Sequence, residues 1–206
     1  MTKTTLFIDL DNTIYPVSSI GDALFQPILE LIGNEPSLIN NMEAIKMDMM
    51  RRPFQKVAKD FNFSKSLTQE VLDQLAETVC TGPMHTFDDY DQLRSLSQIK
   101  FLITTGFTKM QRSKVHLLQI EDDFKEIHIV DPQQSRLTKK DVFLDLMNRY
   151  ELSKASILVI GDDPNSELKA ASELNLDTVL FDRIGRYPSY SDSPRITHYK
   201  ELKAFL

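Results

Sequence analysis

The sequence Phe7-Ile8-Asp9-Leu10-Asp11-Asn12-Thr13 is an apolar run that ends in two carboxylates and a hydroxyl. Leu6 and the two residues after it predict a fully buried strand, because strands of parallel sheets carry near-continuous apolar runs. Asp9 then stands at the edge where open α/β sheets bind their ligands. Two carboxylates so close together repel each other, and a charge at a buried strand end is costly unless a cation or a proton compensates it. We therefore expect a metal ion or a shared proton here.

Length and composition indicate a globular protein with one large domain, or one domain that carries an insertion. The chain has 206 residues, of which 41% are hydrophobic, and this is ample for a core. The formal net charge of -6 argues against a surface that coats nucleic acid, so we expect a small-molecule partner. No stretch approaches the roughly 18 apolar residues of a membrane span. Met1-Thr2-Lys3 leads straight into the strand rather than into a signal-peptide pattern. We expect a cytoplasmic protein.

Cysteine and histidine give no sign of a thiolate or imidazole metal site. The single cysteine, Cys80, excludes an intrachain disulfide and a thiolate-rich zinc site. It follows Val79 in an apolar helix pattern, which predicts a small buried side chain. The four histidines show no metal-ligand spacing; they are His85, His116, His128 and His198. Acidic residues must therefore carry the chemistry.

Strand and helix patterns alternate from Ser97 onward. Strands are expected at 99–103, 127–130, 157–160 and 178–181, with a short edge strand at 196–198 before a terminal helix. Helices are expected from the capping box Thr108-Lys109-Met110-Gln111 toward Ile120, from Thr138 to Tyr150, and from the cap-proline pair Asp163-Pro164 to Asn175. Such alternation implies right-handed crossovers and a parallel sheet covered on both faces. The fold class is therefore α/β, a doubly wound, Rossmann-like parallel sheet.

The segment between Thr13 and about His85 has no strand-like alternation. Helices are expected at 23–32, 38–50, 54–61 and 67–79, the last opened by a Ser66-x-x-Gln69 capping box. Hinges are expected at 16–19 and 81–83, which are rich in proline, glycine and serine. We expect an α/β catalytic core of residues 1–15 and 85–206 with an inserted, all-helical cap domain of residues 16–84.

Polar residues also follow the next predicted strand. Ile103-Thr104-Thr105-Gly106-Phe107 leads into two hydroxyls and a glycine just ahead of a helix. Hydroxyls and backbone N–H groups at such a point can bind an anionic oxygen. The simpler interpretation is an ordinary strand-to-helix loop in which Thr105 is merely polar. A comparable interpretation exists for Asp11 and Asn12, which can simply satisfy the backbone donors of a turn.

Two lysines, Lys139 and Lys140, stand at the head of a predicted helix. The dipole of a helix N-terminus favours anions, so these cations break a local rule, and such breaks tend to be functional. One of the two can still be a solvated surface lysine.

The last patch is Gly161-Asp162-Asp163-Pro164-Asn165-Ser166-Glu167, again a strand that ends in acids. Asp163 is a suitable helix N-cap, and Glu167 suits the first helical turn. Asp162 has neither role, and Gly161 allows close approach of the backbone, so we expect Asp162 to be a metal ligand.

The four patches lie at the C-terminal ends of predicted parallel strands or on the helices reached from them, so the fold gathers them into one crevice. Together they predict phosphoryl transfer. Mg²⁺ takes oxygen ligands from Asp9 and Asp162. Asp9 attacks phosphorus to give an acyl-phosphate, while Asp11 protonates the leaving oxygen and later activates water. Thr104 and Lys139 hold the equatorial oxygens.

This ordered set of motifs resembles the haloacid dehalogenase superfamily of phosphohydrolases. The four motifs correspond to Asp9-Leu10-Asp11-Asn12-Thr13, Thr104, Lys139, and Gly161-Asp162-Asp163 with Glu167. The resemblance implies that Asp9 is the nucleophile and Asp11 the acid/base. It also implies that Mg²⁺ is held by the Asp9 carboxylate, the Asp11 backbone carbonyl and Asp162. The helical insertion is similar to the C1 cap of the family, which closes over the substrate.

Three positions depart from the usual pattern of the superfamily. Thr105 stands where asparagine is common, no Pro-Asp-Pro follows the motif lysine, and Glu167 replaces the second aspartate of the fourth motif. These departures leave Lys140 as a competitor of Lys139, and they leave open whether Asp163 or Glu167 contacts the metal.

The continuation Ile14-Tyr15-Pro16 further resembles the pyrimidine 5'-nucleotidase-like branch, and a nucleoside 5'-monophosphate is the leading substrate. The segment Met50-Arg51-Arg52-Pro53-Phe54 lacks the Gly-Thr-type loop expected of a nucleotidase. In it, Arg51 or Arg52 can reach an anionic substrate or lie on a solvated helix face.

Three other functions compete with a phosphatase that acts on a small phosphorylated metabolite. A dehalogenase is disfavoured because that chemistry needs neither a metal nor a leaving-group acid, and Asp11 supplies one. A phosphomutase and a non-catalytic, phosphate-binding regulatory protein on the same scaffold remain as alternatives.

Overall fold

The centre of the molecule is a six-stranded sheet in the order β3-β2-β1-β4-β5-β6. The computed structural model describes residues 2–206, and Met1, the first residue of the predicted core, lies outside them. All the strand pairs are parallel. The strands are β1 Thr5–Ile8, β2 Ile99–Thr105, β3 Glu126–Val130, β4 Ile157–Gly161, β5 Asp177–Phe181 and β6 Arg195–Ile196. The predicted α/β fold class with a parallel sheet is confirmed.

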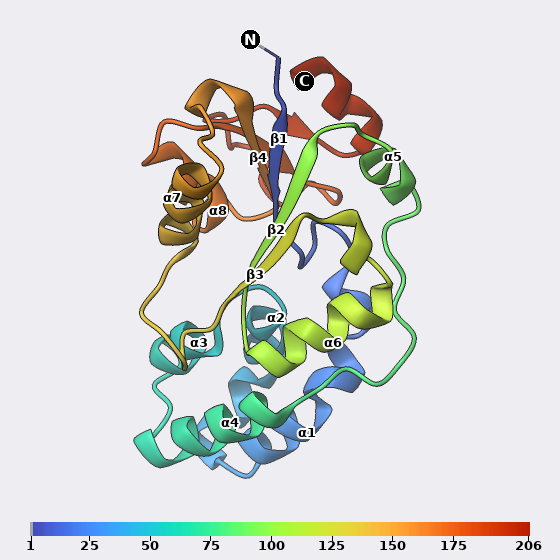
Figure 1. Ribbon diagram of the computed structural model, residues 1–206. Coiled ribbons are helices and arrows are strands. Elements are labelled where there is room, and N and C mark those ends of the chain that lie inside the picture. Colours follow the sequence, from blue (N-terminus) through green and yellow to red (C-terminus); the bar gives the residue numbers. More distant parts are fainter. Residues whose placement is uncertain (1) are drawn as a thin grey trace.

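Helices cover both faces of this sheet. Phe7 and Phe101 point to one face and pack with Phe143 of α7 (Lys139–Arg149) and Ala171 of α8 (Glu167–Ser172). The opposite face is covered by α5 (Tyr90–Arg94), α6 (Thr108–Leu118) and the 3₁₀ helix Tyr199–Phe205. In Figure 1, α7 and α8 lie on one side of the strands and α5 lies on the other. Alternate side chains of each strand therefore contribute to two apolar cores, one on each face of the sheet, as a doubly wound sheet requires.

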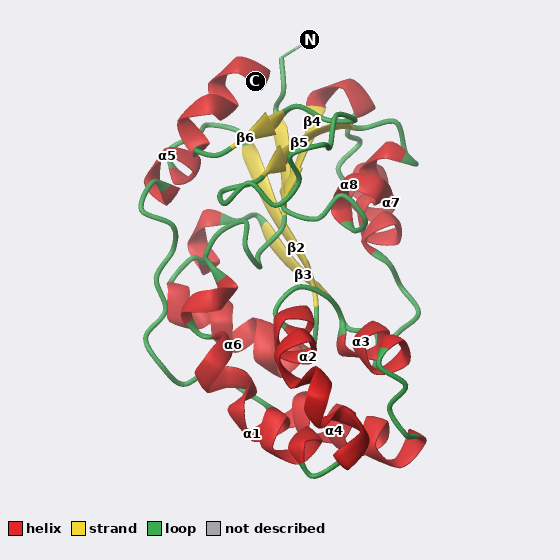
Figure 2. Cartoon of the chain, turned by 180° about the vertical axis from the view of Figure 1, so that it is seen from behind, coloured by secondary structure: helices red, strands yellow, loops and turns green. Residues whose placement is uncertain are grey.

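The segment after β1 is helical, as predicted, and we call α1 to α4 the helical insertion. Its helices are α1 Gly21–Gly33, α2 Met42–Met49, α3 Phe54–Asp60 and α4 Lys65–Glu77, with 3₁₀ turns at Val17–Ser19 and Pro36–Asn41. They enclose an apolar core of their own, to which Phe107 and Met110 of the α6 region contribute. Figure 2 shows this group at the end of the molecule opposite the chain termini. The domain boundaries at residues 16 and 84 stay a prediction.

Several predicted helix caps are wrong, and each has a local cause. The side chain of Ser64, not Ser66, caps α4 by accepting a hydrogen bond from the Leu67 N–H at 3.2 Å. Thr108 opens α6 without a capping box, because its N–H and Oγ1 both donate to Asp131 Oδ2, at 2.8 and 2.9 Å. The helix after β4 begins only at Glu167, because Asp163 instead accepts the Asn165 N–H at 2.8 Å in a local turn.

Some of the other local predictions are confirmed and others are wrong. Thr138 and Asp141 form the predicted capping box of α7, and Asn175 adopts the left-handed conformation with φ of 56°. The predicted helix 38–50 is instead a 3₁₀ turn followed by α2. Cys80 lies beyond the end of α4 and is only half-buried, so its placement in a buried helix face is wrong. Across residues 2–206, helices of the length and apolarity needed to cross a bilayer are lacking.

Candidate active site

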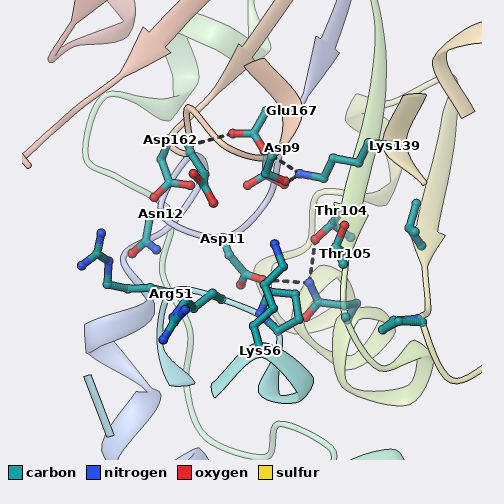
Figure 3. A pocket seen from close by; sticks show the side chains of 18 of the residues that line it. Asp9, Asp11, Asn12, Arg51, Lys56, Thr104, Thr105, Lys139, Asp162 and Glu167 are labelled. Atoms are coloured by element: carbon teal, nitrogen blue, oxygen red, sulfur yellow. Dashed lines mark hydrogen bonds and ion pairs between the residues drawn. The ribbon is translucent and has the colours of Figure 1, made fainter. Parts of the chain in front are cut away.

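A cavity lies where the C-terminal ends of β1, β2 and β4 face the helical insertion. Its volume is about 480 Å³. All the residues predicted to form the site line it, namely Asp9, Asp11, Thr104, Thr105, Lys139 and Asp162. Figure 3 shows their side chains gathered around this cavity. The structure therefore brings together groups that come from four separate segments of the chain, while their chemical roles stay predictions.

Asp9 extends the ladder of β1 and forms a buried ion pair. Its N–H donates to the Ile160 carbonyl at 3.0 Å, which places its carboxylate just beyond the sheet edge. Lys139 Nζ donates to Asp9 Oδ1 at 2.6 Å and to Glu167 Oε2 at 2.7 Å. Asp9 and Lys139 are each 6% exposed and Glu167 is 2% exposed. Three charges are thus held together almost without water.

Burial raises the pKa of Asp9 to about 7, because the loss of hydration outweighs the attraction of Lys139, and Glu167 and Asp11 add repulsion. Burial alone would lower the pKa of Lys139, but Asp9 and Glu167 outweigh it and raise that pKa. The ammonium group therefore stays charged. Lys140, the competing lysine, also lines the cavity, but it pairs with Glu173 at 2.9 Å and not with Asp9.

Glu167 is a structural partner of Lys139 rather than a free carboxylate. Its second oxygen, Oε1, accepts the Asp163 N–H at 2.8 Å. The side chain packs directly on Gly161, where a Cβ atom would lie 2.0 Å from Glu167 Oε1. The absence of a side chain at Gly161 thus lets the Glu167 carboxylate pack against its backbone.

Asp162 faces a cation that the sequence analysis missed. Arg186 Nη1 donates to Asp162 Oδ2 at 3.0 Å, and its Nη2 donates to Asn12 Oδ1 at 3.4 Å. Burial, followed by repulsion from Glu167 and Asp9, raises the pKa of Asp162 well above its usual value, and Arg186 opposes this. Arg186 lies in the loop after β5, and its own N–H donates to Asp182 Oδ1 at 2.7 Å. An acid directly after a buried strand was the available signal, since Asp182 follows β5 as Asp9 follows β1.

Asp11 is turned toward α6. Lys114 Nζ donates to its Oδ1 and Gln111 Nε2 donates to its Oδ2, both at 2.8 Å, and the Tyr15 hydroxyl also donates to Oδ1. Burial would raise the pKa of Asp11, but Lys114 and these hydrogen bonds outweigh it and lower that pKa. Gln111 also donates to Thr104 Oγ1 at 2.6 Å. The sequence analysis gave none of these three partners a role in the site, although Gln111 and Lys114 are polar residues three apart on one helix face.

A sequence model described as haloacid dehalogenase-like hydrolase matches residues 6–181. The chain belongs to this family. The matched region contains all four motifs and the helical insertion. None of the curated proteins compared with this haloacid dehalogenase-like hydrolase matches it.

Solved structures share the fold of this haloacid dehalogenase-like hydrolase at low identity. A hydrolase of the same family from Bacillus subtilis, bound to magnesium, has a TM-score of 0.65 and 21% identity, covering 100% of this chain and 99% of that one. A candidate phosphatase from Clostridium difficile has a TM-score of 0.71 and 13% identity, covering 100% and 99%. The L-2-haloacid dehalogenase from Xanthobacter autotrophicus has a TM-score of 0.59 and 11% identity, covering 99% and 98%. The fold thus accompanies more than one chemistry.

The acidic end of the cavity fits a hard divalent cation. Asp9, Asp162 and Glu167 each offer a carboxylate oxygen within 4.8 Å of the others. Among the described residues, Asp9 Oδ2 and Asp162 Oδ1 accept no hydrogen bond, whereas both oxygens of Glu167 are engaged. Carboxylate oxygens are the donors that Mg²⁺ prefers. In this haloacid dehalogenase-like hydrolase, Asp9 and Asp162 therefore have ligand atoms to spare and Glu167 does not.

Proposed function

We propose that this haloacid dehalogenase-like hydrolase is a Mg²⁺-dependent phosphatase that hydrolyses a small phosphomonoester. The observation that carries this proposal is the setting of Asp9. Its carboxylate is buried, is fixed through one oxygen by Lys139 at 2.6 Å, and keeps the other oxygen free at the cavity wall. A carboxylate held in this way is oriented to act as a nucleophile.

In the proposed reaction, Asp9 attacks phosphorus, the bond to the leaving oxygen breaks, and an aspartyl-phosphate forms on Asp9. Asp11 donates a proton to the leaving oxygen and then takes one from the water that hydrolyses the aspartyl-phosphate. The contacts of Asp11 with Lys114 and Gln111 bear on this role. Because they lower the pKa of Asp11 and so favour its ionised form, Asp11 has to exchange at least one of them when substrate binds in order to hold the proton that it gives to the leaving oxygen.

The Mg²⁺ ion, held by the side chains of Asp9 and Asp162 and the backbone carbonyl of Asp11, supplies positive charge that offsets the repulsion between Asp9 and the phosphoryl group. Lys139 adds a fixed positive charge beside Asp9. Thr104 and Thr105 supply hydroxyl groups at the end of β2 for the phosphoryl oxygens. Gln111 orients the Oγ1 atom of Thr104, and this supports a role of Thr104 in binding the phosphoryl group rather than as an ordinary polar residue of the loop.

The helical insertion serves as a C1-type cap that contributes the wall facing the leaving group. Phe25, Met49 and Phe54 line the cavity from this side. An apolar wall suits the base of a nucleoside 5'-monophosphate, which is the first substrate to test. The Tyr15-Pro16 continuation of the first motif supports the pyrimidine 5'-nucleotidase-like branch, and Tyr15 adds a contact to Asp11.

The test is phosphate release from p-nitrophenyl phosphate and from a panel of nucleotides, with and without MgCl₂. We expect release that requires Mg²⁺ and is lost in Asp9→Asn. The matched control is Asp122→Asn, because Asp122 is exposed and lies outside the cavity. Turnover by Asp9→Asn at the wild-type rate would exclude the proposed mechanism. A wild-type protein that binds beryllofluoride but releases no phosphate would indicate a binding protein instead.

A further inference from the structure

The helical insertion contributes three cations to the cavity wall, Arg51, Arg52 and Lys56, and two of them form no ion pair in the part of the chain that the structure describes. Arg51 follows α2 and Lys56 belongs to α3, and both line the cavity that contains Asp9. Figure 3 shows them across the cavity from Asp9 and Asp162, beyond Asp11. They come from the part of the chain that faces the leaving group, not from the segments that carry the phosphoryl-transfer residues.

These cations lack acidic partners, in contrast to their neighbours. Within residues 2–206, no carboxylate lies within 4.0 Å of either Arg51 or Lys56. The adjacent Arg52 is bound by Asp48 and, at 2.7 Å, by Asp60. The contact made by Arg51 is a hydrogen bond to the Tyr187 hydroxyl at 3.4 Å. Arg52 thus links α2 to α3 through its two ion pairs, whereas Arg51 and Lys56 line the cavity without such a pair.

The acids of the cavity already have other compensation. The carboxylates that line it on the core side and take part in the site are Asp9, Asp11, Asp162, Asp163 and Glu167. Three buried or half-buried cations pair with members of this set, and they are Lys114, Lys139 and Arg186. The divalent ion of the proposed function offsets the remainder. Lys56 also acts on Asp163 at longer range and opposes the rise of its pKa, but neither Lys56 nor Arg51 is held in an ion pair among the described residues, so both can pair with a ligand.

The cavity is also larger than a phosphoryl group needs. At about 480 Å³ it falls in the range of sites that enclose a whole small molecule. Its wall in the helical insertion is otherwise largely apolar and includes Phe25, Met49, Met50, Phe54 and Leu75. A ligand that fills this space has an apolar body between the two charged ends of the cavity.

From this arrangement we propose that Arg51 and Lys56 form a subsite for a second anionic group, a carboxylate or a second phosphate, on the leaving group of the substrate. This inference rests on the proposed phosphatase function. The substrate class is then a phosphomonoester with an apolar body and a second negative charge at its far end. A neutral nucleoside leaving group satisfies the apolar wall but leaves both cations without a partner.

The experiment compares substrates that differ in this charge alone. The pair is 4-(carboxymethyl)phenyl phosphate and its primary amide. Their methylene spacer keeps the two phenol leaving groups electronically similar. A third substrate, phenylene 1,4-bisphosphate, carries a second phosphate in place of the carboxylate. We expect a KM about fivefold lower for the anionic substrates at similar kcat, as two solvent-exposed ion pairs allow. Arg51→Met and Lys56→Met each raise the KM for the anionic substrates toward that for the amide.

Lys59→Met is the matched control, because Lys59 also lies in α3 but is exposed outside the cavity. A preference for the carboxylate alone, or for the bisphosphate alone, identifies the kind of anion bound. Equal KM values for all three substrates would overturn the subsite while leaving the phosphatase intact.

Calorimetric titration of the corresponding benzylphosphonates, which are not hydrolysed, measures the same preference without turnover. If no substrate is hydrolysed, the proposed function fails, and a tighter Kd for the anionic phosphonate that is lost in Arg51→Met still supports the subsite. Equal Kd values would overturn it.

Discussion

Lys114 Nζ lies 2.8 Å from Asp11 Oδ1, and its side chain is only 5% exposed. This ion pair joins α6 to the loop after β1 and lowers the pKa of Asp11 against the effect of burial. A buried cation whose partner is the proposed acid/base links the stability of the site to its chemistry.

Replacing this lysine in Lys114→Met is expected to destabilise the protein and to raise the pKa of Asp11. Removing one partner of a buried pair costs about 3–5 kcal/mol, and less here because Asp11 is partly exposed. If Asp11 is the acid, the basic limb of the pH–rate profile for an alkyl phosphate moves to higher pH. Urea denaturation and the pH dependence of kcat measure the two effects. An unmoved basic limb in a folded Lys114→Met protein would count against Asp11 as the acid.

The raised pKa of Asp9 predicts that stabilisation by Mg²⁺ depends on pH. The pKa is about 7 in the folded protein against 3.8 ordinarily, so the folded state holds more protons between these values. The contribution of Asp9 to the free energy of unfolding therefore falls as pH rises through this window. A cation that binds the ionised carboxylate competes with the proton, so it binds more tightly as the pH rises. We expect the increase in Tm caused by MgCl₂ to grow from pH 5 to pH 8. Thermal denaturation of the wild type and of Asp9→Asn checks this, since the variant should show less of this growth and keep only the part that comes from Asp162.

Gly161→Ala should disrupt the site through Glu167. The added Cβ would lie 2.0 Å from Glu167 Oε1, so the carboxylate has to leave the Asp163 N–H and Lys139. We expect a loss of about 2–4 kcal/mol in unfolding free energy, as for other strained or unpaired buried groups, and a large fall in kcat. Gly33→Ala is the control, because a Cβ there meets nothing within 4 Å. A Gly161→Ala protein with wild-type stability would show that Glu167 has another position available.

The residues whose positions at the cavity could be predicted from the sequence are those fixed by local pattern and strand position. Asp9 and Asp162 directly follow apolar strands, and strand ends at one edge of a parallel sheet must converge. Lys139 follows the capping residue Thr138, so the start of α7 determines where its side chain begins. In each case a short segment and the sheet topology define the position.

The partners of these residues depend on tertiary contacts that no short segment encodes. Gln111 and Lys114 would be ordinary surface residues of a helix if α6 did not face the loop after β1. Asp131 replaces the predicted cap of α6 from another loop, 23 positions away. Side-chain hydrogen bonds of this kind compete with local capping rules, and only the packed structure decides between them.

The loop that carries Arg186 offers the most direct test of the metal site. Its guanidinium lies 3.0 Å from Asp162 Oδ2 and so occupies one of the oxygens that a divalent cation would use. Arg186→Met removes this competing charge. An ion pair that is partly exposed to solvent contributes about 1 kcal/mol, so we expect Mg²⁺ to bind several-fold more tightly to the variant. Loss of Arg186 also raises the pKa of Asp162 further, so the calorimetric titration is repeated at several pH values to separate proton release from the affinity for Mg²⁺. Arg183→Met is the control, because Arg183 pairs with Asp88 and Asp89 instead. Weaker Mg²⁺ binding in Arg186→Met would instead show that the guanidinium orients Asp162 and does not compete with the metal.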